Sequence, residues 1–153
     1  MIEKHLKNED EQVDFGKELA KFVKTKVLIF LEGDLGAGKT TLTRGFLRSL
    51  GHVGNVKSPT YTLIEPYTVK NKNIYHIDLY RVSDINELEF LGIRDILAEE
   101  SIVIIEWPEI AKDWLPKPDL RIKIKKENNG RSIILSSTTD EGKNILKLVG
   151  KKV

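Results

Sequence analysis

The order of hydrophobic and polar positions divides the chain into alternating strand-like and helix-like segments. Two short runs, Val27 to Leu31 and Ile102 to Ile105, are apolar at every position. Strands that are covered on both faces of a sheet show this pattern. Apolar residues also recur at helical spacing over residues 8–24, 41–50 and 140–149. We therefore predict buried strands at 26–32 and 101–106, with helices packed against them.

The remaining segments predict edges, hairpins and short helices. Residues 1–8 resemble an edge segment, and 61–67 and 74–80 form a hairpin in which Pro66 favours an edge position. A second hairpin, 120–126 with 131–137, turns at Asn128-Asn129-Gly130. Short helices are expected at 83–91, 93–98 and 108–115. The predicted class is α/β, with a mixed sheet between helices.

Composition narrows the class of protein. The chain has 153 residues, and we expect them to form one domain, residues 1–153. Its net charge of +2 gives no argument for a nucleic-acid binder driven by bulk charge. It has no cysteine, which excludes disulfides and thiolate metal sites. We see neither a membrane span nor a signal-peptide pattern, so a cytoplasmic protein is the expectation.

The segment after the first buried run carries the clearest chemistry. It reads Gly33-Asp34-Leu35-Gly36-Ala37-Gly38-Lys39-Thr40, which is the G-x-x-x-x-G-K-[ST] phosphate-binding pattern, or P-loop. Glycines allow backbone N–H groups to approach phosphate oxygens, and the following helix directs its N-terminus at the same point. Lys39 supplies a charge for the β- and γ-phosphates. Thr40 supplies a hydroxyl ligand for Mg²⁺, and Thr41 a bond to the α-phosphate.

Hydrolysis also requires a carboxylate near Mg²⁺, normally at the end of a hydrophobic strand. Glu106 follows the second apolar run, and we assign it to Mg²⁺; the alternative is a cap of the next helix. Asp78 lies on one strand face with His76 and Tyr80, and we assign it to the attacking water or the metal's outer shell. Its alternative is a surface salt bridge with Arg81.

Other polar residues are weaker candidates. Thr60, in the loop after the P-loop helix, is a candidate γ-phosphate sensor. His76 fits a core or edge histidine better than a base, and Trp107 fits packing better than nucleotide contact. The basic residues of 121–126 fit a solvated sheet face better than an RNA surface. No Asn-Lys-x-Asp guanine signature occurs, which favours ATP over GTP.

Several motifs together resemble the bacterial TsaE (YjeE) family in their order and spacing. They are the P-loop through Thr41, Ser58-Pro59-Thr60-Tyr61-Thr62-Leu63, His76-Ile77-Asp78-Leu79-Tyr80-Arg81, Glu87-Leu88-Glu89-Phe90-Leu91-Gly92 and Ile105-Glu106-Trp107-Pro108. The resemblance extends from about residue 10 to residue 131. It implies a three-layer P-loop NTPase fold whose central sheet is mainly parallel, with antiparallel hairpins.

The resemblance also implies a function. Family members are ATPases needed to make N6-threonylcarbamoyladenosine beside the tRNA anticodon. They bind a TsaB–TsaD heterodimer and meet tRNA indirectly or weakly. The implied ligands are ATP and Mg²⁺. The implied metal ligands are Thr40 and Glu106. From the residues themselves, as argued above, we predict Lys39, Asp78 and Glu106 as catalytic residues. Nucleotide contacts are implied at the P-loop through Thr41, and at Gln12, Gly130 and Arg131.

Two alternatives remain open on the residues alone. A small-molecule kinase uses the same scaffold, but it usually needs an Arg-rich lid, and the arginines of this chain are scattered. A nucleotide-binding adaptor with negligible turnover is also compatible, because no arginine finger is identifiable and isolated P-loop switches hydrolyse slowly.

Overall fold

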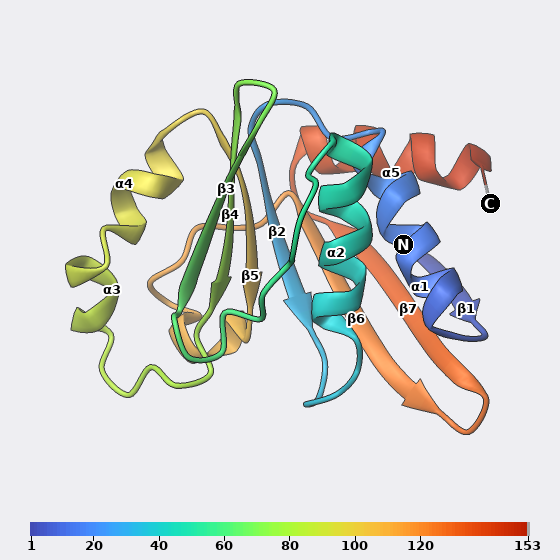
Figure 1. Ribbon diagram of the computed structural model, residues 1–153, viewed down its shortest axis with the longest axis horizontal. Helices are drawn as coiled ribbons and strands as arrows, with labels where there is room; N and C mark the ends of the chain where they lie inside the picture. The colour runs from blue at the N-terminus through green and yellow to red at the C-terminus, as the bar shows by residue number, and fades with distance from the viewer. Residues whose placement is uncertain (153) are drawn as a thin grey trace.

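One seven-stranded sheet forms the centre of the computed structural model, which describes residues 1–152 (Figure 1). The strands are β1 (Ile2–Leu6), β2 (Val27–Glu32), β3 (Ile64–Val69), β4 (Lys72–Asp78), β5 (Ser101–Glu106), β6 (Leu120–Glu127) and β7 (Gly130–Ser137). The helices are α1 (Glu9–Ala20), α2 (Lys39–Leu50), α3 (Asn86–Phe90), α4 (Ile93–Ala98), the 3-10 helix η1 (Pro108–Ala111) and α5 (Asp140–Lys152). The expected domain boundary at Val153 lies outside the described residues.

The strand order is β1-β7-β6-β2-β5-β4-β3. The central strands β6, β2, β5 and β4 run parallel, and β1–β7, β6–β7 and β3–β4 pair antiparallel. Among the described strands, all but β3 and β7 therefore point the same way. The predicted mixed, mainly parallel sheet, its two hairpins and its two edge segments are confirmed.

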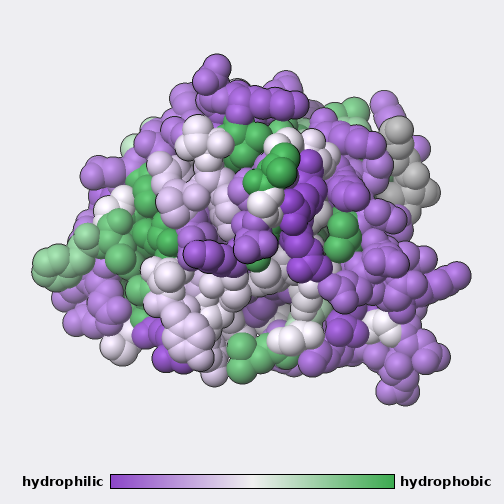
Figure 2. Space-filling view, in the orientation of Figure 1, coloured by the Kyte–Doolittle hydropathy of each residue, from purple (hydrophilic) through white to green (hydrophobic). Residues whose placement is uncertain are grey.

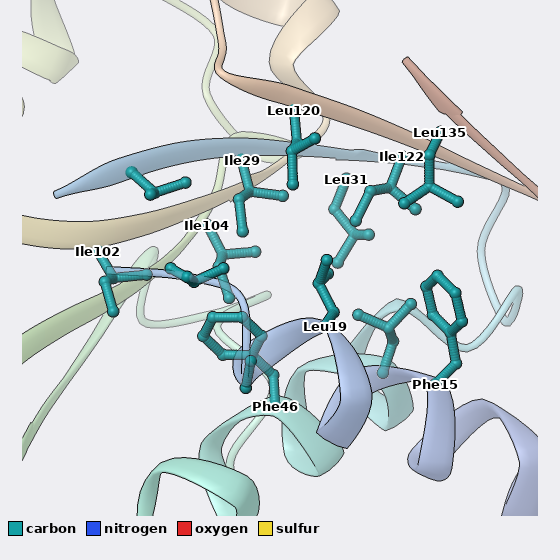
Figure 3. Close-up of a cluster of buried hydrophobic side chains, with 14 of the residues drawn as sticks. Phe15, Leu19, Ile29, Leu31, Phe46, Ile102, Ile104, Leu120, Ile122 and Leu135 are labelled. Carbon is teal, nitrogen blue, oxygen red and sulfur yellow. The ribbon is translucent and has the colours of Figure 1, made fainter. Parts of the chain in front are cut away.

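Helices cover both faces of the sheet and define two hydrophobic cores. The larger core, drawn in part in Figure 3, joins α1, α2 and α5 to one face through residues such as Leu19, Phe46 and Ile104. The smaller core lies on the other face, under α3, α4 and η1. It includes Phe30 of β2, Ile105 of β5 and Leu88 of α3. Adjacent residues of β5 enter different cores, which explains why that run has no polar face. The three-layer prediction is confirmed.

Three element boundaries differ from the sequence prediction. Helix α1 ends at Ala20 rather than near residue 24. Val23 is nevertheless buried, because Phe22 and Val23 continue as a tighter turn whose amides bond three residues back. Strand β3 begins only at Ile64. The predicted helix at 108–115 is the shorter η1 followed by turns.

The β3–β4 hairpin turns over two residues rather than the six predicted. Lys70 and Asn71 have positive φ angles of 50° and 65°. Two such residues in a row fit the right-handed twist of a hairpin. Pro66 lies in β3 at the sheet edge, as predicted, since it cannot donate a hydrogen bond to a central ladder.

Helices α1 and α2 approach so closely that their backbones touch at two glycines. A Cβ built on Gly16 would lie 2.2 Å from the Leu42 carbonyl oxygen, and one built on Gly45 would lie 2.1 Å from the Val13 oxygen. Both distances are far below van der Waals contact. This packing places the N-terminal half of α1 beside the loop that precedes α2.

Within the described residues, no helix has both the length and the apolar character needed to cross a membrane.

Candidate active site

The candidate site lies where three neighbouring parallel strands end at one edge of the sheet. Strand β2 leads into the P-loop, β5 ends at Glu106 and β4 ends at Asp78. Asp78 and Glu106 are register partners across the β4–β5 pair. In open α/β sheets, ligands bind outside the carboxyl ends of the strands. The sheet thus brings together the P-loop, Asp78 and Glu106, which are far apart along the chain and were each predicted as part of the site.

The P-loop adopts backbone conformations that favour glycine. Gly36 and Gly38 have φ angles of 77° and 99°, and α2 begins at the next residue, Lys39. A Cβ on Gly38 would also lie 2.1 Å from the Gln12 side-chain nitrogen. The loop therefore presents backbone N–H groups next to a helix N-terminus, as an anion site requires.

Two distant side chains hold the carbonyl groups of this loop. Gln12 Nε2 donates to the oxygens of Ala37 and Gly38 at 3.0 and 2.9 Å. Arg131 Nε donates to the Ala37 oxygen at 3.0 Å. The C=O and N–H of one peptide unit point in opposite directions. Tying the carbonyls down therefore fixes the opposing N–H groups, so both residues brace the loop.

The P-loop separates two cavities. One, of about 360 Å³, contains the implied nucleotide contacts Gln12, Gly130 and Arg131 together with Lys7, Asn8, Glu9, Gly36, Gly38 and Thr41. The other, of about 290 Å³, is lined by Lys39, Thr40, Thr60, Asp78, Glu106 and Trp107, among others. Gly36, Gly38 and Thr41 of the P-loop and α2 line both cavities, so the two cavities adjoin along the loop.

Lys39 lies in a cluster of partners at the second cavity. Its Nζ donates to the Gly33 oxygen at 2.6 Å and lies 4.0 Å from Glu106 Oε1. Nζ also lies 4.0 Å from the Trp107 ring centroid, so Trp107 contacts the site as well as packing against the smaller core. Burial lowers the pKa of Lys39, and the negative charge of Glu106 partly opposes that shift.

Trp107 occupies an unusual backbone conformation directly after Glu106. Its φ of 57° and ψ of 47° place a bulky side chain in the left-handed region. Non-glycine residues held there cost free energy and are concentrated at functional sites. Its ring also contacts Tyr80, with centroids 4.9 Å apart. Trp107 therefore combines the expected packing role with a contact to Lys39 in the candidate site.

Asp78 is buried and hydrogen-bonded rather than paired with Arg81. Its Oδ1 accepts the Tyr80 N–H at 2.8 Å, and its Oδ2 accepts the Thr60 hydroxyl at 3.3 Å. Arg81 instead lies over the Tyr61 ring. Burial raises the pKa of Asp78, and the Tyr80 N–H bond opposes this shift. Thr60 thus lies at the site, as predicted for a sensor.

Glu106 has a partner that sequence reasoning missed. Its Oε2 lies 2.5 Å from His76 Nε2, and both side chains are buried. The alternative role as a helix cap is wrong, because η1 has no side-chain cap. The sequence did contain a signal for this contact, because His76 and Asp78 lie on the same face of one strand and His76 therefore points toward the same region as Asp78.

The raised pKa of Asp78 predicts a stability gain when its charge is removed. The folded state binds this proton more tightly than the unfolded state does, so stability falls as pH rises through the interval between the two pKa values. Above that interval the full cost of burying the charge remains. Asp78→Asn keeps the oxygen that accepts from Tyr80. We expect its Tm to rise by a few degrees at pH 7, about 1 kcal/mol.

Thermal unfolding at pH 7 and near pH 4 tests this prediction. The gain should shrink as the pH is lowered, because the folded wild-type protein takes up the Asp78 proton more readily than the unfolded chain does. Asp84→Asn is a matched control, because the exposed Asp84 accepts the N–H of Asn86 through the same local bond. It should change Tm little. A lower Tm for Asp78→Asn at pH 7 would contradict the prediction.

The residues at the second cavity provide oxygen ligands rather than a closed metal cage. The described residues contain no group of three or more His, Cys, Asp or Glu able to hold a metal. Thr40, Asp78 and Glu106 nevertheless line one cavity beside the P-loop. This donor set fits Mg²⁺, which is usually held through one or two carboxylates plus substrate phosphates.

The fold and this site define a P-loop protein of the three-layer α/β class. A model of the family described as threonylcarbamoyl adenosine biosynthesis protein TsaE matches residues 6–133. The chain belongs to the TsaE family.

Individual relatives agree with this assignment. The chain is 46% identical over 150 residues to the tRNA threonylcarbamoyladenosine biosynthesis protein TsaE of Haemophilus influenzae, covering 95% of each chain. It is 40% identical over 119 residues to the Bacillus subtilis protein of the same name, covering 78% of this chain and 74% of that one. The crystal structure of YdiB from Bacillus subtilis superposes with a TM-score of 0.85 at 28% identity, covering 99% of this chain and 95% of that chain.

Proposed function

We propose that the chain is a Mg²⁺-dependent ATPase that supports repeated turnover of a TsaB–TsaD complex. That complex makes N6-threonylcarbamoyladenosine beside the anticodon of tRNAs that read codons beginning with A. The observation that carries the ATPase proposal is the meeting of Lys39, Asp78 and Glu106 beside the P-loop. Membership of the TsaE family supports the part of the proposal that concerns tRNA modification. A cytoplasmic location belongs to the same proposal.

Each residue has a role in this proposal. The P-loop N–H groups and Lys39 hold the phosphates, and Gln12 and Arg131 keep the loop in its binding conformation. Thr40 and Glu106 hold Mg²⁺, which would neutralise charge on the transferred phosphoryl group. Asp78, hydrogen-bonded to Thr60, orients the attacking water. Thr60 reports the presence of the γ-phosphate.

One observation supports dependence on a partner. Among the described residues that line the second cavity, Lys39 is the sole cation. P-loop enzymes usually need a further positive group to stabilise the transition state, and a partner often supplies it. The same observation favours a low-turnover adaptor as the second candidate, if no partner completes the site.

The surface provides a region suited to a protein partner. Figure 2 shows a largely hydrophilic face with hydrophobic side chains gathered at the left, over α3 and α4. Phe90, at the end of α3, is 92% exposed, and Ile85, at its start, is 42% exposed. Gathered exposed apolar side chains are typical of protein contact surfaces. This region supports the proposed association.

Reconstitution tests the proposal. TsaB, TsaD, ATP, threonylcarbamoyl-adenylate and tRNA are combined with or without this protein, and modified adenosine is measured over many turnovers. We expect the yield to exceed one product per complex only when the protein is present. Arg48→Ala, on the exposed side of α2, should behave as wild type. Equal yields with and without the protein would remove the proposed role.

A further inference from the structure

His76 is a fully buried side chain that contacts the site through Glu106. It belongs to β4, two residues before Asp78 and on the same strand face. Its Nε2 lies 2.5 Å from Glu106 Oε2, so the two strands that end at the site are joined by a side-chain hydrogen bond. A buried imidazole needs a polar partner, and the partner here is the predicted Mg²⁺ ligand Glu106.

The hydrogen bonds of the ring indicate which nitrogen carries the proton. A carboxylate oxygen can only accept, so Nε2 must donate. Nδ1 is buried and has no partner among the described residues. The only partner of the ring among the described residues is therefore the Glu106 carboxylate.

The bond divides the two oxygens of Glu106 between different tasks. Oε2 is occupied by His76, and Oε1 lies on the side of Lys39, 4.0 Å from its Nζ. Without His76, the carboxylate could rotate and exchange its oxygens. A fixed carboxylate loses less conformational freedom when a ligand binds.

We propose that His76 is a positioning residue that fixes Glu106 so that Oε1 alone faces the phosphate and Mg²⁺ region. This inference rests on the proposed function, because it concerns the same carboxylate. Partners that orient a metal-binding carboxylate typically change metal affinity by about 10–100-fold when they are removed. Removal of the His76 donor should thus weaken the Mg²⁺ response and leave Mg²⁺-independent binding intact.

The test uses two substitutions that differ in the donor. His76→Leu removes the N–H, whereas His76→Gln keeps an amide donor near the position of Nε2. Binding of a fluorescent ATP analogue is measured first in EDTA and then across a Mg²⁺ titration. His5→Leu is the matched control, because His5 and Glu127 form an exposed pair with 3.1 Å between Nδ1 and Oε2.

We expect His76→Leu to raise the Mg²⁺ concentration for half-maximal tightening by about 10-fold or more. Affinity in EDTA should stay unchanged, and His76→Gln and His5→Leu should stay close to wild type. An unchanged Mg²⁺ midpoint in His76→Leu would overturn the inference. A Gln variant as impaired as the Leu variant, or a parallel loss of affinity in EDTA, would overturn it too, because each indicates a purely structural role.

Nitrogen NMR of the unliganded wild-type protein provides a readout that does not depend on a variant that folds. The shifts of the imidazole nitrogens should show a proton on Nε2 of His76, and an Nε2 without a proton would contradict the hydrogen bond donated to Glu106. The outcomes also separate the two proposals. If wild-type protein shows no Mg²⁺ response at all, the proposed function fails and the inference fails with it. If the wild-type protein responds to Mg²⁺ and His76→Leu shows the same Mg²⁺ midpoint, the inference fails and the proposed function stands.

Discussion

Replacing Lys39 or Glu106 with alanine should abolish ATP hydrolysis by the assembled complex. Lys39 is the cation among the described residues that line the second cavity, and the buried Glu106 carboxylate lies 4.0 Å from its Nζ. Loss of one such electrostatic group typically costs about 10²–10³-fold in rate. Because phosphoryl transfer depends almost entirely on positioning and charge, neighbouring residues cannot replace either side chain.

Steady-state release of phosphate in the presence of TsaB and TsaD measures this effect. Lys24→Ala and Glu3→Ala remove the same side chains at exposed positions and should retain wild-type rates. Association with the partners must be measured in parallel, so that a loss of rate is assigned to the site. Near wild-type turnover in both Lys39→Ala and Glu106→Ala would reject the mechanism.

Replacing Gly16 or Gly45 with alanine should strongly destabilise the fold. Each new Cβ would meet a backbone carbonyl of the opposite helix at about 2 Å, so the helices must separate. Overpacking of this kind costs about 1–3 kcal/mol or more, and in a chain of this size 1 kcal/mol corresponds to about 2–4 °C in Tm. We expect Tm to fall by about 5–10 °C, although alanine has the higher helix propensity.

Gly150→Ala is the matched control within the same protein. Gly150 lies in α5, and the nearest atom to a Cβ built there is Ile2 Cδ1 at 3.5 Å, an ordinary contact. Its Tm should stay equal or rise slightly. Separation of α1 from α2 should also move Gln12 away from the P-loop and weaken nucleotide binding in EDTA. Unchanged Tm values for Gly16→Ala and Gly45→Ala would contradict the close approach.

Local sequence features were sufficient for most of the fold. The unbroken apolar runs of β2 and β5 were recognisable as buried strands, because they are short, rich in β-branched residues and without a polar face. Asn8 caps α1 through a bond from Glu11 N to Oδ1 at 2.9 Å, and Gly51 ends α2 in the left-handed conformation, so both helix ends follow from residue types with known local preferences. Boundaries were less predictable, as the early end of α1 at Ala20 shows.

Some features of the site were likewise predictable from the sequence, and others were not. The P-loop is contiguous, so its glycines, Lys39 and Thr40 could be recognised from spacing alone. Glu106 and Asp78 could be proposed because each ends a strand. The brace from Gln12 and Arg131 was not predictable as such, because the residues joined lie 25 and 94 positions apart. The resemblance named these residues without indicating that they bind loop carbonyls.

The sequence by itself determined which segments become strands and helices, and which loop binds phosphate. Both depend on interactions between near neighbours in the chain. Only the tertiary structure decided that β2, β5 and β4 lie side by side, because strand order depends on packing across the whole sheet. That order brings Asp78 beside Glu106 and aims His76 at the Glu106 carboxylate. Contacts between distant residues of this kind leave no periodic or local signal in one sequence.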